Sequence, residues 1–244
     1  MKKLKSALGS FKRQIKSLIF NHLILRSVRN SDDLIRWHFN FWSDSNHVSK
    51  SGLKVALTHF GDKPLNILET GTSAWGTDST RLFDSYVRKF GGSLISVDIR
   101  SLPSERLKNQ LAGSSNLLVG DSVSEIEKLA ESLSFDFIYL DSFDVDWMNP
   151  VPSALHGLSE MKVVLPRLKA ESVVIIDDTP CSFDFQTPAE SRARNEFTDE
   201  YGVNPGKGGL AVKFLDDIGV GYSVMHHSSN LVLQIQNFRA SGRD

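Results

Sequence analysis

Short apolar segments alternate with segments of helical periodicity between residues 53 and 236. The apolar segments are too short for helices and rich in Ile, Leu and Val, which predicts buried strands. The expected strands are 66–70, 93–97, 116–119, 135–140 and 172–176, and the expected helices are 53–60, 79–90, 104–111, 124–133, 153–168 and 208–218. Two final apolar segments, 222–226 and 231–235, flank a short polar turn and predict a hairpin.

Strands that alternate with helices form parallel sheets with helices on both faces, so each strand is continuously apolar. We therefore predict a doubly wound α/β fold with a mostly parallel, seven-stranded sheet and a C-terminal antiparallel hairpin. Residues 51–244 form the main domain in this prediction. Residues 1–50 form an amphipathic and aromatic extension, expected as an N-terminal helical cap.

The extension begins with an amphipathic pattern over residues 1–20. Leu4, Leu8, Phe11, Ile15 and Leu18 recur at spacings of three and four, with basic side chains between them. Such a helix lies on an anionic membrane surface, or it packs on the body or on a second subunit; we favour packing. Residues 31–50 are rich in aromatic residues and histidine and form either a lid over a pocket or a helical core, and we prefer the core.

Charge separates the two regions. The formal net charge is −1, yet residues 1–31 hold eight basic and no acidic side chains, so the remainder has a net charge of −9 (−1 minus 8). An acidic body suits a metal-binding enzyme better than a nucleic-acid reader, and no nucleic-acid partner is expected. Cys181 is the only cysteine, which excludes an intrachain disulfide and a thiolate metal cluster and fits a cytoplasmic location. No apolar run approaches the roughly 20 residues that span a bilayer.

Acidic residues and a glycine follow the ends of the expected strands. Because ligands of parallel α/β sheets bind at the carboxyl ends of the strands, these residues are expected to converge on one crevice. Five strand ends that each supply an acid or a glycine are far more specific than a single motif. The residues are Glu69, Gly71, Asp98, Asp121, Asp141, Asp177 and Asp178.

The first strand runs into the loop ETGTSAWGTDST at residues 69–80. Its glycines permit a sharp turn, and the helix that starts at Ser79 presents free N–H groups to a nucleotide or a carboxylate. The alternative is a plain strand-to-helix turn. Asp98 either accepts hydrogen bonds from two ribose hydroxyls or caps the next helix. Asp121 either reaches the edge of a base or caps the helix that follows it.

Asp141, Asp177 and Asp178 bring three carboxylates together, and their mutual repulsion would be costly without compensation. Mg²⁺, which prefers oxygen ligands, would compensate them; alternatively, Asp178 caps the next segment and only one or two of the acids face the crevice. His156 and Asp144 are candidates for a general base on an acceptor hydroxyl. The segment GKGG at 206–209 lacks the rest of a P-loop, and we interpret it as a loop before a helix.

The ordered motifs ILETGTS…DST, SVDI, VGDS, FDFIYLDS and VVIIDD resemble those of class I S-adenosylmethionine-dependent methyltransferases, over residues 53–236. The resemblance is closest to the catechol and macrocin O-methyltransferase type. It implies S-adenosylmethionine and Mg²⁺ as cofactors, with the metal on Asp141, Asp177 and Asp178. The cofactor-binding residues that it implies are Glu69, Gly71, Thr72, Ser73, Gly76, Ser79, Thr80, Asp98 on the ribose, Ile99, Asp121 near the adenine, Ser122 and Asp141.

The predicted reaction is methyl transfer from a sulfonium to a hydroxyl of a small molecule or sugar, assisted by Mg²⁺. Metal-independent transfer with His156 as the base is the alternative mechanism. A nicotinamide-dependent oxidoreductase is disfavoured because no G-x-G-x-x-G follows the first strand. A non-catalytic nucleotide-binding or scaffold module, held peripherally at a membrane by residues 1–20, is the remaining candidate. A homo-oligomer is compatible with each of these functions.

Overall fold

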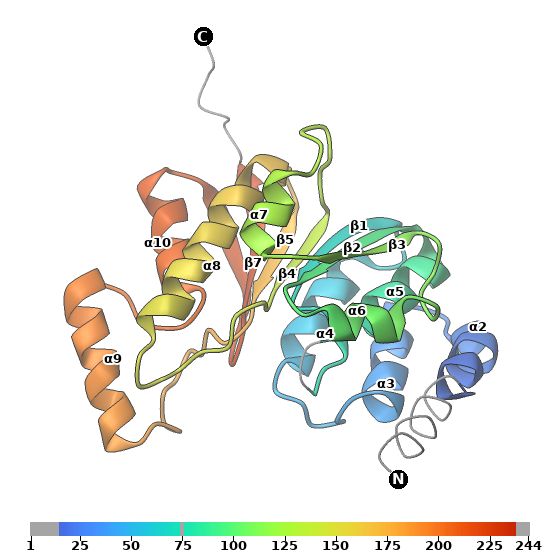
Figure 1. Ribbon diagram of the computed structural model, residues 1–244, viewed down its shortest axis with the longest axis horizontal. Helices are drawn as coiled ribbons and strands as arrows, with labels where there is room; N and C mark the ends of the chain where they lie inside the picture. Colours follow the sequence, from blue (N-terminus) through green and yellow to red (C-terminus); the bar gives the residue numbers. More distant parts are fainter. Residues whose placement is uncertain (1–14, 74–75, 238–244) are drawn as a thin grey trace.

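The computed structural model describes residues 15–73 and 76–237, which fold into one sheet with helices on both faces (Figure 1). The strand order is β3-β2-β1-β4-β5-β7-β6. Strands β1 to β5 are parallel, and β7 runs antiparallel to its neighbours β5 and β6, so the predicted fold is confirmed. The strands are β1 (Leu65–Thr70), β2 (Gly92–Asp98), β3 (Ser115–Val119), β4 (Phe137–Leu140), β5 (Val173–Ile176), β6 (Gly221–His227) and β7 (Leu231–Asn237).

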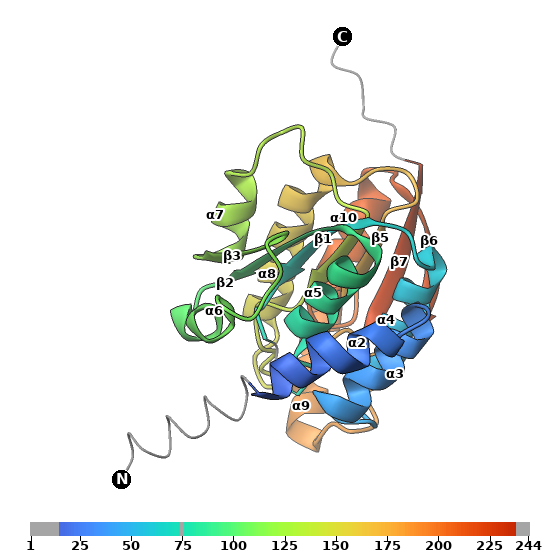
Figure 2. The ribbon, with the colours of Figure 1, turned by 90° about the vertical axis from the view of Figure 1, so that its right-hand side faces the viewer.

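The alternation of side chains along the strands divides the apolar core into two layers. Ile67, Phe137 and Tyr139 pack with α3, α4 and α5, whereas Leu68 and Ile138 pack with α7, α8 and α10. Figures 1 and 2 show these two groups of helices on opposite faces of the sheet. The helices are α3 (Ser31–Phe41), α4 (Lys50–Phe60), α5 (Ser79–Phe90), α7 (Ser122–Glu127), α8 (Val151–Val164) and α10 (Gly209–Asp217).

Two helical segments are shorter than their apolar patterns predict. The helix expected over 104–111 is α6 (Ser101–Leu107), at the β2–β3 end of the sheet. The helix expected over 124–133 is α7, which ends at Glu127. Beyond it the amide of Leu129 donates to the carbonyl of Ile126, so a tight three-residue turn replaces the regular helical bond. The predicted helix 153–168 ends in the 3₁₀ segment η2 (Leu165–Arg167).

The N-terminal segment shares the core of α3, α4 and α5. Of the amphipathic helix predicted over 1–20, residues 1–14 lie outside the described part of the chain. Residues 15–19 are helical and continue into the π-helix η1 (Phe20–Ile24) and α2 (Leu25–Ser27). Phe20 and Phe39 are buried in one cluster with Tyr139 of β4, which supports the core interpretation of these aromatic residues. Within the described ranges, no helix is long and apolar enough to cross a membrane.

Helix α9 (Pro188–Tyr201) was not predicted. It lies in the connection from β5 to α10 and buries a single large apolar residue, Phe197, so its sequence has no apolar stripe. Its start did have a local signal. Thr187 and Glu190 form a reciprocal capping box, and Pro188 occupies the first helical position. Figure 1 shows α9 projecting from the body beside the start of α8.

Candidate functional site

The carboxyl ends of β1 and β4 meet at the point where the chain changes direction across the sheet. From β1 the chain continues to β2 on one side, and β4 lies on the other side of β1. Gly71 follows β1 with a φ of +86°, and a Cβ there would lie 2.1 Å from the carbonyl oxygen of Asp141. Only glycine allows this approach. Such switch points are where ligands of open α/β sheets bind.

Glu69 organises the loop after β1 from within. Its side chain is fully buried and accepts hydrogen bonds from Ser79 (2.5 Å), Thr80 (2.6 Å) and Ser96. Burial raises the pKa of Glu69 to about 7, although these three hydroxyls oppose the rise. Thr72 is also fully buried and bonds to Ser96 (2.7 Å). Glu69, Thr72, Ser79 and Thr80, all predicted at the cofactor, therefore support the loop as a connected hydroxyl network.

The loop itself is held in an uncommon backbone conformation. Ser73 and Asp78 have φ values of +56° and +48°, in the left-handed region that non-glycine residues rarely adopt. The amide of Ser73 donates to Thr80 Oγ1 (2.7 Å), and its hydroxyl donates to Asp78 (2.8 Å). Strained residues that surrounding contacts over-determine are typical of ligand sites.

The N-terminal segment closes over the second half of this loop. A Cβ on Gly76 would lie 2.9 Å from Nε2 of His47, and Ser43 donates to the carbonyl of Gly76. His38 is completely buried and donates from Nε2 to the carbonyl of Thr77 (2.7 Å). Burial lowers the pKa of His38 to about 4, so the ring is neutral. The extension is thus part of the site's frame.

Asp98 ends β2 with a side chain that is almost completely buried. Arg100 donates to both of its oxygens, from Nε (2.9 Å) and from Nη2 (2.7 Å), and its amide adds a third bond (2.7 Å). Each carboxylate oxygen has two acceptor positions, so one position on Oδ2 remains for a ribose hydroxyl. Ile99, between them, is 71% exposed. The sequence reasoning did not identify Arg100.

Asp121 and His156 lie further along the same edge. Asp121 caps α7 by accepting from the amide of Ser124 (3.0 Å), the alternative that the sequence left open. His156 Nε2 contacts the hydroxyls of Ser122 (3.1 Å) and Ser142 (2.8 Å). Hydrogen bonding to the buried Glu160 raises the pKa of His156. The predicted base therefore lies beside Ser122, which was predicted to bind the cofactor, and Asp121, which was predicted near the adenine, caps a helix.

The three aspartates do converge, around a lysine. Lys207 Nζ lies 2.7 Å from Asp141 and 2.9 Å from Asp178, and the lysine side chain is only 2% exposed. Asp177 accepts instead from the hydroxyls of Ser49 (3.1 Å) and Tyr139 (3.0 Å). Burial raises the pKa of Asp177, and burial together with Asp177 raises that of Asp141 while Lys207 opposes the rise.

These carboxylates do not fit Mg²⁺ while Lys207 is among them. Mg²⁺ requires oxygen ligands at about 2.0–2.1 Å in an octahedron, whereas Asp141 and Asp178 already bind an ammonium group. Among the described residues, no group of three or more His, Cys, Asp or Glu side chains could hold a metal ion. Asp144, the other candidate base, is exposed, and its charge raises the pKa of Arg100 after the larger effect of Asp98. The GKGG segment was the only sequence signal for Lys207.

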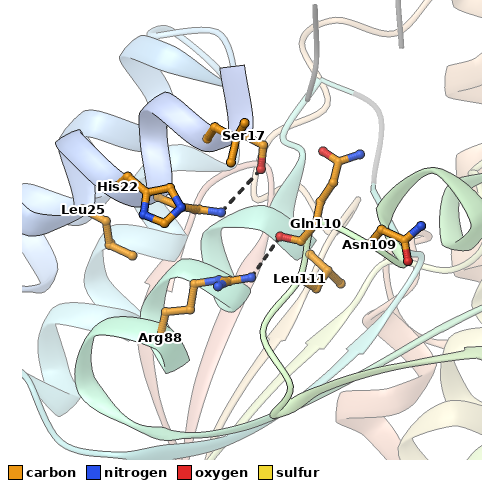
Figure 3. Close-up of a pocket in the computed structure, with 9 residues that line it drawn as sticks. Ser17, His22, Leu25, Arg88, Asn109, Gln110 and Leu111 are labelled. Atoms are coloured by element: carbon orange, nitrogen blue, oxygen red, sulfur yellow. Dashed lines mark hydrogen bonds between the residues drawn. The ribbon is translucent and has the colours of Figure 1, made fainter. Parts of the chain in front are cut away.

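Two cavities of the described residues lie away from this edge of the sheet. One of about 640 Å³ lies between the N-terminal helices and the end of α5, close to the start of β3 and hence at the opposite edge of the sheet. Figure 3 shows Ser17, His22 and Leu25 on one side of it, and Arg88 donating to the carbonyl of Gln110 (2.9 Å) on the other. A second cavity, of about 490 Å³, lies between α6 and β3. Neither contains the converging carboxylates.

No protein-family model matches the chain, and no curated protein matches its sequence. In structure it is similar to a Staphylococcus aureus protein described as a caffeoyl-CoA O-methyltransferase, with 16% identity, 76% of this chain and 82% of that chain covered, and a TM-score of 0.50. It is also similar to the SAH-bound Podospora anserina methyltransferase PaMTH1, with 13% identity, 86% and 89% covered, and a TM-score of 0.52. The chain therefore has the Rossmann-like fold of class I methyltransferases.

Proposed function

We propose that the protein is an S-adenosylmethionine-dependent methyltransferase that acts on a hydroxyl of a small molecule or sugar. The observation that carries this proposal is the convergence at one sheet edge of Gly71, packed on the backbone of Asp141, and the buried carboxylate of Asp98. The fold shared with an O-methyltransferase-like protein and an SAH-bound methyltransferase supports it.

The cofactor would extend along this edge. The loop from Gly71 to Ser73, which leaves β1 at the switch point of the sheet, would lie at the methionine end. Asp98 would accept a hydrogen bond from a ribose hydroxyl at its remaining acceptor position. Asp121, which caps α7, and the adjacent Ser122 would lie toward the adenine. This order follows the strand order β1, β2, β3. It leads away from Asp141, Asp177 and Asp178, which we call the acidic cluster.

In the transfer step, a lone pair of the acceptor oxygen forms the O–CH₃ bond while the C–S bond breaks and its electron pair returns to sulfur, leaving S-adenosylhomocysteine. The hydroxyl proton passes to a base. Asp178 is the most accessible of the three aspartates, with 43% of its side chain exposed, and it has a left-handed φ of +45°. His156 and Asp144 remain the other candidates. Positioning would supply most of the rate enhancement.

The acceptor would meet an aromatic surface. Trp147 follows β4, and Phe183 and Phe185 follow β5, so all three lie on the loops that leave the acidic strand ends. Their ring centroids are 5.4–6.2 Å apart. Phe185 is 57% exposed. Such a surface suits the flat face of an aromatic or sugar ring, which is in keeping with a hydroxyl of a small molecule or sugar as acceptor.

Calorimetric titration with S-adenosylhomocysteine tests the proposal. We expect micromolar binding by the wild type and a loss of about ten-fold or more in Asp98→Asn, because a hydrogen bond to a charged group contributes about 1.5–3 kcal/mol. Asp136→Asn is the matched control: Asp136 precedes β4 at the opposite sheet edge, where it accepts from the amide of Asn66 (2.8 Å). Failure of the wild type to bind would contradict the proposal, and binding without transfer to any hydroxyl acceptor would indicate a non-catalytic module.

A further inference from the structure

The side chain of Lys207 reaches the acidic cluster because the backbone of residues 206 and 207 packs very closely against α8 and against Asp178. Its carbonyl lies so close to α8 that a Cβ on Gly157 would be 2.1 Å from it. On the other side, Gly206 has a φ of +116°, and a Cβ there would lie 2.5 Å from the carbonyl oxygen of Asp178. Three glycines of the GKGG segment and one of α8 thus bring this one side chain to the ends of β4 and β5.

Further bonds fix the backbone around Lys207. Its amide donates to the carbonyl of Asp178 (3.3 Å), and the amide of Gly208 donates to Thr179 Oγ1 (2.9 Å). Thr179 in turn donates to the carbonyl of Asp177 (3.0 Å). The loop that carries the lysine is therefore tied to the segment 177–179, which supplies one of its two carboxylate partners, Asp178.

Lys207 is also fully buried, which lysine rarely is unless it is paired. Burial alone would lower its pKa, but the charges of Asp141, Asp178 and Asp177 more than reverse this effect and raise it. By geometry alone, the ammonium lies between two carboxylates at a place where three of them would otherwise repel one another. It is held by two of them at hydrogen-bond distance, and a divalent ion could not approach the same oxygens without facing a second positive charge beside it.

We propose that Lys207 takes the place of a divalent metal ion: its ammonium is a built-in counter-ion that excludes Mg²⁺ and fixes Asp141 and Asp178 at the acceptor side of the site. Because its side chain is only 2% exposed, Lys207 is a positioning residue that acts through these aspartates. Its role in methyl transfer rests on the function proposed above. The exclusion of metal does not, since it follows from the ion pairs alone.

The test is a calorimetric titration of the full chain with Mn²⁺ as the probe. We expect no stoichiometric Mn²⁺ binding to the wild type. Lys207→Met removes the ammonium beside Asp141, Asp177 and Asp178, and we expect it to bind one Mn²⁺ per chain. Lys213→Met is the matched control, because Lys213 forms an exposed pair with Asp217 on α10 and should gain no binding. Mn²⁺ at about 100 times its Kd should raise the melting temperature of Lys207→Met by about 5 °C.

Stoichiometric Mn²⁺ binding to the wild type that is lost in Asp177→Asn would overturn the proposal, and so would a folded Lys207→Met that binds no metal. If Lys207→Met does not fold alone, refolding with and without Mn²⁺ replaces the titration: rescue by the metal supports the proposal, and failure of both overturns it. Lys207→Arg, which keeps the charge, should bind no Mn²⁺.

A parallel titration with S-adenosylhomocysteine, in the presence and absence of EDTA, separates this inference from the proposed function. Unchanged binding of S-adenosylhomocysteine under chelation agrees with both. A wild type that binds neither S-adenosylhomocysteine nor Mn²⁺ would contradict the methyltransferase while leaving the metal exclusion intact.

Discussion

Glu69 at the end of β1 and Asp141 just after β4 lie on neighbouring strands, and both carboxylates are largely shielded from water. Glu69 is surrounded by neutral donors, the hydroxyls of Ser79, Thr80 and Ser96. Asp141 belongs to a group of three acids whose principal partner is the ammonium of Lys207. Hydroxyls can rotate to serve a protonated or an ionised carboxyl, whereas an ammonium needs an ionised partner. The end of β1 therefore depends on neutral donors, whereas the ends of β4 and β5 depend on a cation, which opposes the rise that burial causes in the pKa of Asp141 and Asp177.

Removal of the cation should have the largest effect. Lys207→Met leaves buried carboxylates without a counter-ion, and we expect a loss of about 3–5 kcal/mol in the free energy of unfolding at pH 7. Urea unfolding measures it, with the exposed Lys213→Met as a control expected to change stability by less than about 0.5 kcal/mol. A loss for Lys207→Met as small as that of the control would mean that Lys207 is not the counter-ion of this cluster.

Glu69→Gln should change the pH dependence of stability. The folded pKa of about 7 lies above the ordinary unfolded value of about 4.3, so the contribution of Glu69 is fully present below pH 4.3 and is lost as the pH rises to about 7. At about 1.4 kcal/mol per pH unit, the loss is on the order of 4 kcal/mol. Urea unfolding across this range should show the decline in the wild type and a flatter profile in Glu69→Gln. Identical pH profiles for the wild type and Glu69→Gln would mean that Glu69 does not titrate in this range. The proposed difference between the end of β1 and the acidic cluster would then be wrong.

Single hydroxyl donors should contribute less, and unequally. Ser96 serves both Glu69 and Thr72, so Ser96→Ala should cost about 2 kcal/mol. Ser49 donates to Asp177, which keeps its bond from Tyr139, so Ser49→Ala should cost about 1 kcal/mol. Thermal unfolding of the two variants side by side checks the order. A larger loss for Ser49→Ala would show that the acidic cluster depends on its hydroxyls as much as the end of β1 does.

Arg100→Ala should have the smallest effect on folding. Its side chain is 61% exposed, whereas that of Asp98 is only 3% exposed; because water reaches the guanidinium, we expect the pair to contribute about 1 kcal/mol or less. This variant tests whether the stability of the protein depends on the cation beside Asp98 as it depends on the cation of the acidic cluster. We expect an unchanged melting temperature within about 2 °C, measured by circular dichroism. A marked loss of stability would place Asp98 with the cation-dependent acids.

The strands and their order of appearance were predictable because a sheet covered on both faces demands apolar residues at every position. The convergence of Asp98, Asp141 and Asp177 followed from the same rule, since parallel strands end at one edge. Helix α9 was missed because it buries little beyond Phe197, and burial is the property that periodicity detects.

The ion pairs of Lys207 could not be predicted from the sequence. Its partner Asp141 is 66 residues away, and contact depends on close approaches at Gly157 and Gly206 that only coordinates reveal. Arg100 was closer, two residues after Asp98, but a nearby arginine in sequence does not specify a bidentate bond. The acidic residues of a site can therefore be predicted from the strand ends. The basic residues that pair with them depend on tertiary contacts, which the sequence does not show.

The packing of the N-terminal extension on the loop after β1 gives the protein an optical signal of its own. The guanidinium of Arg81 lies 4.3 Å from the ring centroid of Trp42 and forms an ion pair with Asp78 (3.1 Å). Asp78 in turn accepts from Ser73 at the end of β1 (2.8 Å). Indole emission responds to nearby charge, so a ligand that shifts this loop should change the emission of Trp42.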